Sequence, residues 1–578
     1  HSLLQALNIQ PPKELVPLFI KSIWDLEERA FVMKSSQTNN PRLSEYKKPL
    51  TIQPSFIANV NQEMVNYLKK IKVEIKEHWE DDAKKLNNQI FEFLQQKTEE
   101  IISQFDNSIL LYAYKQIEYI EGKRENDKIQ MEFDVQKYIA FDINERHNKE
   151  RLEVSELAVS AKHILHTVLK VNPQGSKNVS EHDWYYLMAL SKIINETIQR
   201  SDQLYYRLVK SGIEITHSYE LIDIDESSEI NSNEYYKETT NSNIILAKNK
   251  TLKTNQLNQN ESSKDVLLFD ANLNSAWLKE FEFSLENMVK IIAILGRHIF
   301  KETNYFPLIA LSIKEINTFI GETLLEINND EIEKIISFLS LDFNTYSNNE
   351  YMDYSLDRLM KKKERINLSP FIKVDDKYLF GQQLLLASFT SWHNTLIDGD
   401  IPFSIDEANL VKKELNKIHD KLDKELEVLA YEEAVKAVGK EFVRMTINKF
   451  QTLSKNFPQK PPCGEIDLLV VNTNTKTIFV LDAKNVNKNF RTAEIDRELN
   501  KFLKGKKSYL IKLNKKFDFI KENKDEILNH FQVEDKSGWK IKKGFVVNKL
   551  YVSAFYKEKV DFILIDDLSE FLQKDENL

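Results

Sequence analysis

Cysteine is almost absent from this chain, and long apolar runs are absent altogether. One cysteine, Cys463, occurs among 578 residues, which excludes an intramolecular disulfide and any cysteine-rich zinc or iron–sulfur site. Every apolar run is shorter than the roughly 18 residues that a membrane-spanning helix needs. The sequence also opens without the basic-then-apolar pattern of a secretory signal. These absences predict a cytoplasmic protein with no membrane partner.

Two motifs of nucleotide and zinc chemistry are missing as well. The phosphate-binding pattern Gly-x4-Gly-Lys-Ser/Thr does not occur, because Gly505, which precedes Lys506, Lys507 and Ser508, has no upstream glycine at the required spacing. An ATP-driven motor would therefore have to be a partner. No His-Glu-x-x-His occurs either. His163 and His166 share a predicted helix face without a neighbouring carboxylate or cysteine, and we interpret them as structural.

At 578 residues the chain is too long for one ordinary core, so we expect about two to four domains. Residues 1–222 are expected to form a helical domain with long helices. Apolar residues at three- and four-residue intervals predict one helix that continues from Met64 to Phe93. Ser180 and Asp183 have the spacing of a capping box and predict the start of another helix.

Residues 223–266 are rich in Asn, Ser, Thr, Glu and Lys and are predicted to be a polar loop or linker. Residues 267–405 are predicted to form a second helical region, in which 371–374 and 377–380 make a small hairpin. Residues 406–578 are the last predicted domain. This domain contains a group of charged residues that suggests a catalytic site.

Acidic residues interrupt two apolar, β-rich runs near the C-terminus. Asp467 lies in one run and Asp482 at the end of the next, and the polar turn 472–476 predicts a hairpin that brings the two carboxylates together. A carboxylate among Ile, Leu, Val and Phe costs free energy unless it has a ligand. Oxygen ligands of this kind suit Mg²⁺. A lysine beside the metal, here Lys484, can orient or activate a water that attacks phosphorus.

This pattern resembles the active-site signature of the PD-(D/E)xK superfamily of metal-dependent nucleases, in the form of its Mrr-type and archaeal-resolvase branches. The residues that carry the resemblance are Gly464, Asp467, Asp482, Lys484 and Asn485. It is confined to residues 406–578. It implies a restriction-endonuclease-like domain, Mg²⁺ as the cofactor with Mn²⁺ as a substitute, and the Ala483 carbonyl as a further metal ligand.

The superfamily adds a glutamate from a helix that precedes the hairpin. Residues 421–440 have apolar residues at helical spacing and contain Glu432 and Glu433. An aromatic residue before the glutamate, and apolar residues three and six places after it, favour Glu432, with Glu433 as the alternative. The implied metal ligands are Asp467, Asp482, Glu432 and Ala483, and Lys484 completes the catalytic set.

The remaining elements of the last domain agree with this interpretation. Residues 492–503 are predicted to be a helix, and 544–547 and 560–565 are predicted to be buried strands. The expected fold is therefore multidomain: a mainly α N-terminal region, followed by a C-terminal α/β domain with a central mixed sheet flanked by helices.

Charge is divided unevenly along the chain. Residues 484–549 contain 18 Lys/Arg and 9 Asp/Glu, a net of +9, whereas the whole chain is −9 and the remainder therefore −18. A polyanion would be attracted to the basic segment. The predicted phosphate contacts are Lys488, Arg491, Arg497, Lys504, Lys506 and Lys507.

The sequence therefore predicts a cytoplasmic, Mg²⁺-dependent endonuclease that hydrolyses double-stranded DNA. By analogy with the resemblance, it would be an effector of bacterial restriction or antiviral defence, with the helical region serving recognition, dimerisation or contact with a partner protein. Two alternatives stay open. The domain could be a catalytically idle DNA-binding scaffold, or the nuclease could act only with a partner or on RNA.

Overall fold

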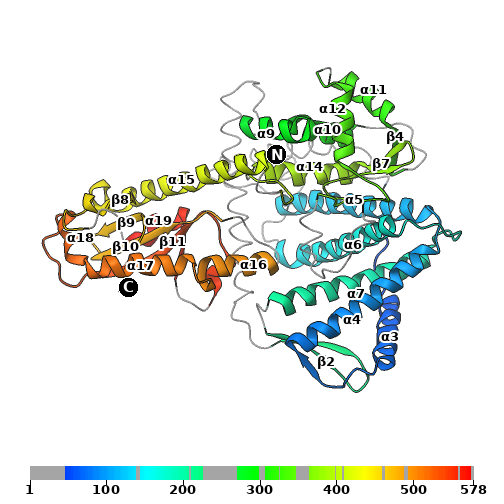
Figure 1. The fold of residues 1–578 in the computed structure, drawn as a ribbon, viewed down its shortest axis with the longest axis horizontal. Helices are drawn as coiled ribbons and strands as arrows, with labels where there is room; N and C mark the ends of the chain where they lie inside the picture. The colour runs from blue at the N-terminus through cyan, green and yellow to red at the C-terminus, as the bar shows by residue number, and fades with distance from the viewer. Residues whose placement is uncertain are drawn as a thin grey trace, which may run out of the picture. The chain divides into compact units, whose positions relative to one another are not determined.

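The computed structural model describes residues 46–137, 143–206, 210–225, 270–298, 306–324, 326–345, 363–397, 399–405, 409–457, 463–486, 492–556 and 560–574 (Figure 1). They divide into two compact units. The first takes in residues up to Val73, Asn87–Gln199 and Asn274–Ser404, and the second takes in Glu74–Leu86, Arg200–Leu273 and Ile405–Leu578. Parts of both predicted helical regions, 1–222 and 267–405, thus belong to one unit.

The first unit is mainly helical. Its helices are α3 (Pro54–Lys70), α4 (Glu80–Ser103), α5 (Ser108–Lys137), α6 (Ile143–Val171), α7 (Glu181–Tyr206), α9 (Ala271–Phe281), α10 (Leu285–Arg297), α11 (Ile313–Thr323), α12 (Asn329–Phe338) and α14 (Gln382–Ile397). Two of them, α4 and α9, begin in the second unit, and α7 ends there. A four-stranded sheet of order β4-β7-β6-β5 accompanies them, made of β4 (Leu308–Ser312), β7 (Lys377–Gly381), β6 (Phe371–Val374) and β5 (Ser340–Leu341). The antiparallel β6/β7 pair confirms the predicted hairpin.

Local signals place several helix ends in this unit. The Asp183 backbone N–H donates to Ser180 Oγ, and the Ser180 N–H donates back to the Asp183 carboxylate, so α7 begins where the sequence predicted. Ser312 and Glu315 form a complete capping box at α11. The core joins α5, α6 and α7 to the sheet through buried aliphatic residues such as Ile117, Leu165 and Ile372.

Two predictions for residues 1–222 were wrong. The helix expected to run from Met64 to Phe93 is interrupted, because α3 ends at Lys70 and Lys72 adopts a left-handed backbone with φ of 53°. The region is also not entirely helical. An antiparallel sheet of β1 (Glu77–Trp79), β2 (Ser211–Ile215) and β3 (Leu221–Asp225) belongs to the second unit. Of the predicted linker 223–266, only the last three residues of β3 lie within the described residues.

The C-terminal part of the second unit is built on a five-stranded mixed sheet of order β12-β11-β10-β9-β8. Its strands are β8 (Val443–Ile447), β9 (Ile466–Asn472), β10 (Thr477–Ala483), β11 (Lys540–Val547) and β12 (Asp561–Leu564). β8, β9 and β10 are antiparallel neighbours, and β11 and β12 continue parallel to β10. The predicted hairpin, the later strands and the mixed sheet are thereby confirmed.

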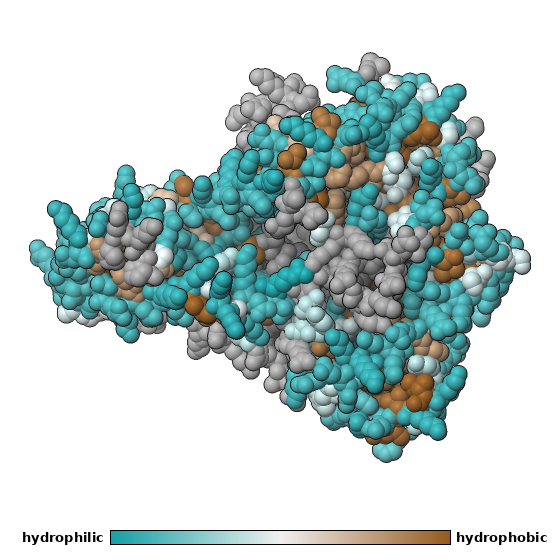
Figure 2. All heavy atoms as spheres, viewed as in Figure 1, coloured by the Kyte–Doolittle hydropathy of each residue, from teal (hydrophilic) through white to brown (hydrophobic). Residues whose placement is uncertain are grey.

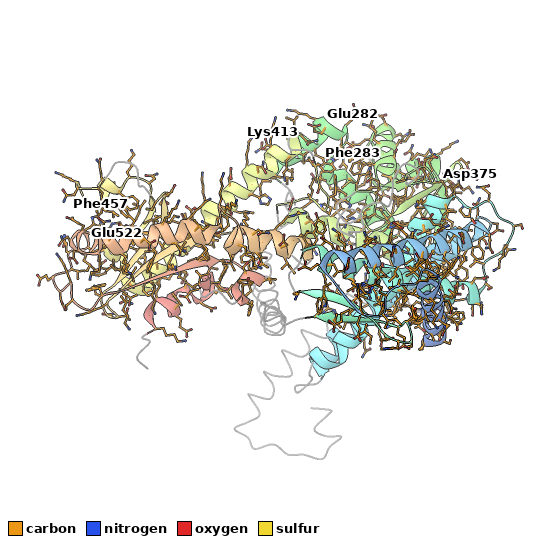
Figure 3. All side chains as sticks on the ribbon, turned by 60° about the horizontal axis from the view of Figure 1, so that its bottom comes forward. Glu282, Phe283, Asp375, Lys413, Phe457 and Glu522 are labelled. Atoms are coloured by element: carbon orange, nitrogen blue, oxygen red, sulfur yellow. The ribbon has the colours of Figure 1, made fainter. Side chains whose placement is uncertain are left out.

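Helices cover both faces of this sheet. They are α15 (Leu410–Val438), α16 (Thr492–Leu499), the π-helical turn η4 (Asn500–Lys504), α17 (Tyr509–Glu522), α18 (Lys524–His530) and α19 (Leu568–Gln573). Ala430 and Ala434 of α15 pack with Leu468 and Phe479 on one face, together with α19. Leu513 of α17 packs on the other face. Lys413 in α15 and Glu522 at the end of α17 mark the two covering helices in Figure 3.

Hydrophilic residues predominate on the face shown in Figure 2, with apolar residues in scattered groups. Within the described ranges, no helix combines the length and the apolar character that crossing a bilayer requires.

Candidate active site

The β9/β10 hairpin determines where the two predicted aspartates lie. Its register pairs Leu468 with Leu481, and one further step places Asp467 opposite Asp482. Alternation along each strand directs both carboxylates to the face covered by α17. Lys484 follows β10, and its Nζ lies 2.9 Å from Asp467 Oδ2 and 3.7 Å from Asp482 Oδ2. The structure therefore brings these three predicted residues together.

A fourth charge, which the sequence interpretation missed, completes this cluster. Lys516 of α17 places its Nζ 2.5 Å from Asp482 Oδ1 and 3.6 Å from Asp467 Oδ1. Each of the four carboxylate oxygens thus faces an ammonium group. We call Asp467, Asp482, Lys484 and Lys516 the charge cluster. The side chains of Asp482 and Lys516 are only 2% and 7% exposed, so their charges depend on one another rather than on water.

Lys516 had a signal in the sequence. It lies between Leu513 and Ile520, which are fully buried on the same helix. A lysine at an apolar position of a helical pattern needs a buried partner. The Asp-x-Lys pattern does not include it, because Lys516 lies 32 positions beyond Lys484.

Burial and the neighbouring charges together shift the pKa values of the charge cluster. It raises the pKa of Asp482, and the neighbouring Asp467 carboxylate raises it further, although Lys484 and Lys516 oppose both effects. Burial lowers the pKa of Lys484, but Asp482 and Asp467 outweigh it, so the net shift of that pKa is upward. Lys484 is therefore held as an ammonium, a form suited to balancing negative charge rather than accepting a proton.

The structure does not bring the two predicted helix glutamates to the charge cluster. Glu432 is exposed, and Glu433 pairs with Lys436 at 2.5 Å. Two other α15 carboxylates interact electrostatically with the cluster: Asp423 with Lys484, and Glu427 with both Asp467 and Lys484. Glu427 is the one that is partly buried. Partial burial raises its pKa, the charge of Asp467 adds to the rise, and Lys484 opposes it. Five residues separate Glu427 from Glu432, which rotates their side chains by roughly 140° around the helix, so the two cannot face the same site.

Glu427 could have been found from the buried stripe of α15. Leu426, Ala430 and Ala434 recur at four-residue intervals and are buried, so the residue beside Leu426 borders the sheet. The aromatic-and-apolar pattern around Glu432 also fits a stripe that packs on the sheet. The structure confirms the helix that this pattern predicted.

The backbone around Lys484 is held firmly. The Ala483 N–H donates to Asp467 Oδ2 at 3.1 Å, and the Ala483 carbonyl accepts from Lys484 Nζ at 2.8 Å. Asn485 accepts a hydrogen bond from Asn548. Gly464 has φ of 85°, a conformation that suits glycine. Of the residues that carry the resemblance, Gly464 and Asn485 thus have structural roles.

The donor set can be tested against a divalent metal. Among the described residues, no three His, Cys, Asp or Glu side chains lie close enough together to form a metal cage. Mg²⁺ does not require such a cage, since it commonly binds one or two carboxylates and completes its octahedron with water and substrate phosphate. Asp467, Asp482 and the Ala483 carbonyl are oxygen donors at adjacent positions, and this set fits that pattern.

Two further lysines lie with Lys484 around the ring of Tyr509. The Nζ atoms of Lys484, Lys501 and Lys512 lie 5.4, 5.7 and 5.6 Å from the ring centroid of Tyr509. Lys501 and Lys512 were not among the predicted phosphate contacts. Of those, Arg497, Lys504, Lys506 and Lys507 are exposed in the segment 497–507, whereas Lys488 and Arg491 lie outside the described residues.

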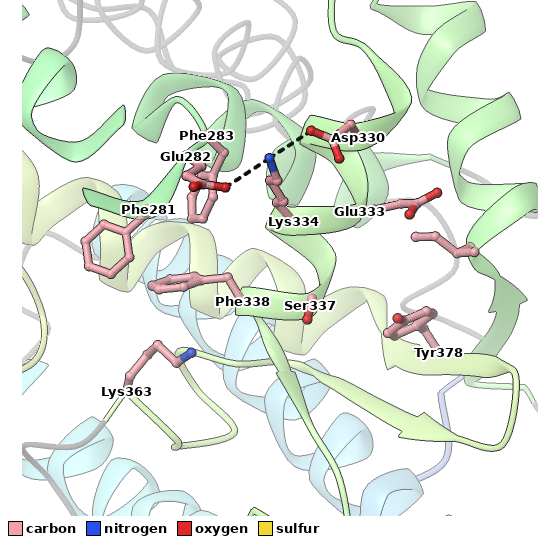
Figure 4. A pocket seen from close by; sticks show the side chains of 11 residues that line it. Phe281, Glu282, Phe283, Asp330, Glu333, Lys334, Ser337, Phe338, Lys363 and Tyr378 are labelled. Atoms are coloured by element: carbon pink, nitrogen blue, oxygen red, sulfur yellow. Dashed lines mark ion pairs between the residues drawn. The ribbon is translucent and has the colours of Figure 1, made fainter. Parts of the chain in front are cut away.

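A pocket of about 600 Å³ lies in the first unit, and none of the charge-cluster residues line it (Figure 4). Its aromatic side belongs to Phe281, Phe283 and Phe338, which continue into a buried ring cluster. Lys334 at its rim pairs with Glu282 and Asp330 at 3.1 and 2.8 Å. The aromatic side of the pocket is thus part of the core, and the lysine at its rim is already paired with carboxylates. The charge cluster is therefore the stronger candidate for a functional site.

Comparison with models of protein families, with curated proteins and with solved structures gives no match for this chain.

Proposed function

We propose that the C-terminal part of the chain is a divalent-metal-dependent nuclease that hydrolyses phosphodiester bonds of double-stranded DNA. One observation carries the proposal: Asp467 and Asp482 meet across a hairpin end with Lys484 between them. Buried acidic side chains at the end of a sheet cost free energy and are kept where they bind a ligand or perform chemistry.

Three further features support the assignment. A helix, three antiparallel strands, further helices and two parallel strands follow one another in the order that the PD-(D/E)xK resemblance requires. Glu427 supplies the helix carboxylate near Asp467. Lys501 and Lys512 add positive charge around Tyr509, next to Lys484, where a phosphate backbone would approach.

Asp467, Asp482 and the Ala483 carbonyl would hold Mg²⁺ or Mn²⁺, which when bound polarises a phosphate and lowers the pKa of a coordinated water. Lys484 balances the charge that accumulates on the phosphate and orients the attacking water. Lys501 and Lys512 hold the neighbouring phosphates and so position the scissile bond. Glu427 supplies a further negative charge on the α15 side of the site.

A second candidate is a nucleic-acid-binding module without catalysis. The pairing of Lys516 with Asp482 favours it, because the cluster is already electrically neutral without a metal. Calorimetric titration with Mg²⁺ or Mn²⁺ separates the two candidates, since the binding module requires no metal.

The direct test is cleavage by the full chain. Supercoiled plasmid, single-stranded DNA and RNA are each incubated with Mg²⁺, Mn²⁺ or EDTA. The nuclease predicts metal-dependent nicking or linearisation of plasmid, lost in EDTA and in Asp482→Asn. The matched control is Asp518→Asn, which removes the same charge from an exposed position of α17 and should cleave like the wild type. Equal cleavage by wild type and Asp482→Asn would refute the assignment, and cleavage of RNA alone would change the substrate.

A further inference from the structure

Lys516 presents a problem that the PD-(D/E)xK resemblance does not address. Its Nζ lies within 4 Å of both aspartates, on the Oδ1 side of each, while Lys484 occupies the Oδ2 side. A divalent ion bound by both carboxylates needs oxygens from each of them. Such an ion would lie within a few ångströms of the Lys516 ammonium, and two cations at that separation in a buried site repel strongly.

The ion pairs of Lys516 with the two aspartates are not incidental contacts at the protein surface. Its side chain is 7% exposed, it comes from a helix outside the hairpin, and its neighbours on that helix face are the fully buried Leu513 and Ile520. A buried lysine is held in place by its partner charges. Its partners here are the two proposed metal ligands.

We propose that Lys516 is a resident counter-ion of the metal site. Its ammonium neutralises Asp467 and Asp482 when no metal is bound, and a divalent ion binds by displacing it from their Oδ1 oxygens. The inference rests on the proposed metal-dependent function and deepens it by identifying a positioning residue that regulates access of the ion. It implies that the wild-type protein binds metal weakly, because every binding event must break the contacts of Lys516.

The test uses the full chain with Lys516→Met, which keeps the stem of the side chain and removes its charge. Lys515→Met is the matched control, because Lys515 is the exposed neighbour on the same helix and loses the same charge. Titration calorimetry with Mg²⁺, Mn²⁺ and Ca²⁺ at constant ionic strength should show at least about tenfold tighter binding in Lys516→Met. Lys515→Met should stay within about twofold of the wild type.

Thermal unfolding provides a second readout. In EDTA, Lys516→Met should melt below the wild type, because two carboxylates are left with one ammonium, and saturating metal should raise its melting temperature by more than it raises that of the wild type. Lys516→Gln replaces Lys516→Met if the latter does not fold, since the amide can still donate a hydrogen bond to Asp482 and carries no charge.

The outcomes separate the two proposals. Metal affinity in folded Lys516→Met or Lys516→Gln that is equal to or weaker than that of Lys515→Met would overturn the counter-ion role, even if the wild type cleaves DNA. Tighter metal binding in these variants, together with a wild type that cleaves no nucleic acid, would keep the counter-ion role and refute the nuclease.

Discussion

At the scale of single residues, the charge cluster is stable only while its charges balance. Asp482 and Lys516 are almost fully buried, and removing either one leaves the remaining three charges of the cluster unbalanced in a site with little access to water. Substitution of Asp482 therefore destabilises the metal-free protein, although it also removes repulsion from Asp467. Function and stability are coupled at this residue, so activity losses must be compared with folding measurements.

The substitution Lys484→Met tests the role of the central ammonium. We expect cleavage to fall by about 10²–10³-fold, as when one charge-stabilising donor is lost from an active site. Metal affinity should be retained or increased, since Lys484 competes for the same carboxylates. Cleavage rates and calorimetric metal titrations on the same variant measure both quantities. A collapse of metal binding alongside activity would show that Lys484 organises the site rather than the reaction.

The two glutamates of α15 offer a paired comparison. Glu427→Gln should reduce cleavage by about tenfold or more, because it removes a negative charge beside Asp467 that would help to hold a divalent cation at the proposed site. Glu432→Gln makes the same chemical change on an exposed face of the helix and should leave cleavage unchanged. Single-turnover cleavage assays at saturating metal decide between the two residues. The reverse result would restore Glu432 as the helix carboxylate.

At the scale of elements, a side chain of one helix caps the N-terminus of another. Glu118 of α5 is fully buried at the start of α14, where it accepts the backbone N–H groups of Gln383 and Leu384 at 2.6 and 3.0 Å. Tyr46 donates to the same carboxyl at 2.7 Å. A carboxyl group at a helix N-terminus satisfies donors that the helix itself cannot. Glu118 therefore joins two helices that are far apart in the sequence.

This contact predicts a pH dependence of stability. Burial raises the pKa of Glu118 to about 7, although the hydrogen bonds from Tyr46, Gln383 and Leu384 oppose the shift. The folded state thus holds its proton at pH values where the unfolded chain has lost it. The stabilisation from Glu118 is complete below about pH 4.5 and is lost as the pH rises through about 7.

Unfolding experiments from pH 4.5 to 8 measure this effect. Relative to Glu118→Gln, the wild type should lose about 3 kcal/mol of its free energy of unfolding across that range. Glu125→Gln, which removes the same charge from a half-buried position of α5, is the control and should show no comparable trend. A constant difference between wild type and Glu118→Gln would mean that the carboxyl group is ionised in the folded protein.

At the scale of the whole molecule, the charges and the cores of the C-terminal part are self-contained. The two core clusters around the five-stranded sheet use only residues from Ala430 onward. The basic segment 484–549 carries +9 against −18 for the rest of the chain. We therefore expect this part of the chain to fold as a separate fragment and to attract a polyanion.

A fragment of residues 405–578 should accordingly bind DNA at low salt and weaken steeply as salt increases, by counterion release. A second fragment, residues 46–404, is the comparison and should not bind. Binding isotherms at 50 and 200 mM salt measure the difference. Tight binding by residues 46–404, with none by 405–578, would move recognition into the helical unit.

Local patterns in the sequence determined the hairpin and the charged residues that meet at its end. The turn 472–476 and the apolar runs beside it specify strands of equal length, and their register alone sets Asp467 opposite Asp482 with Lys484 next to them. Tertiary structure decided which side chains from other elements lie beside these three residues. Lys516 and Glu427 arrive on helices packed against the sheet, and helical periodicity indicates that a face is buried but not which residue meets which. The strands 77–79 and 211–215 also depend on tertiary structure, because strand pairing across more than 130 residues overrides local helical preference.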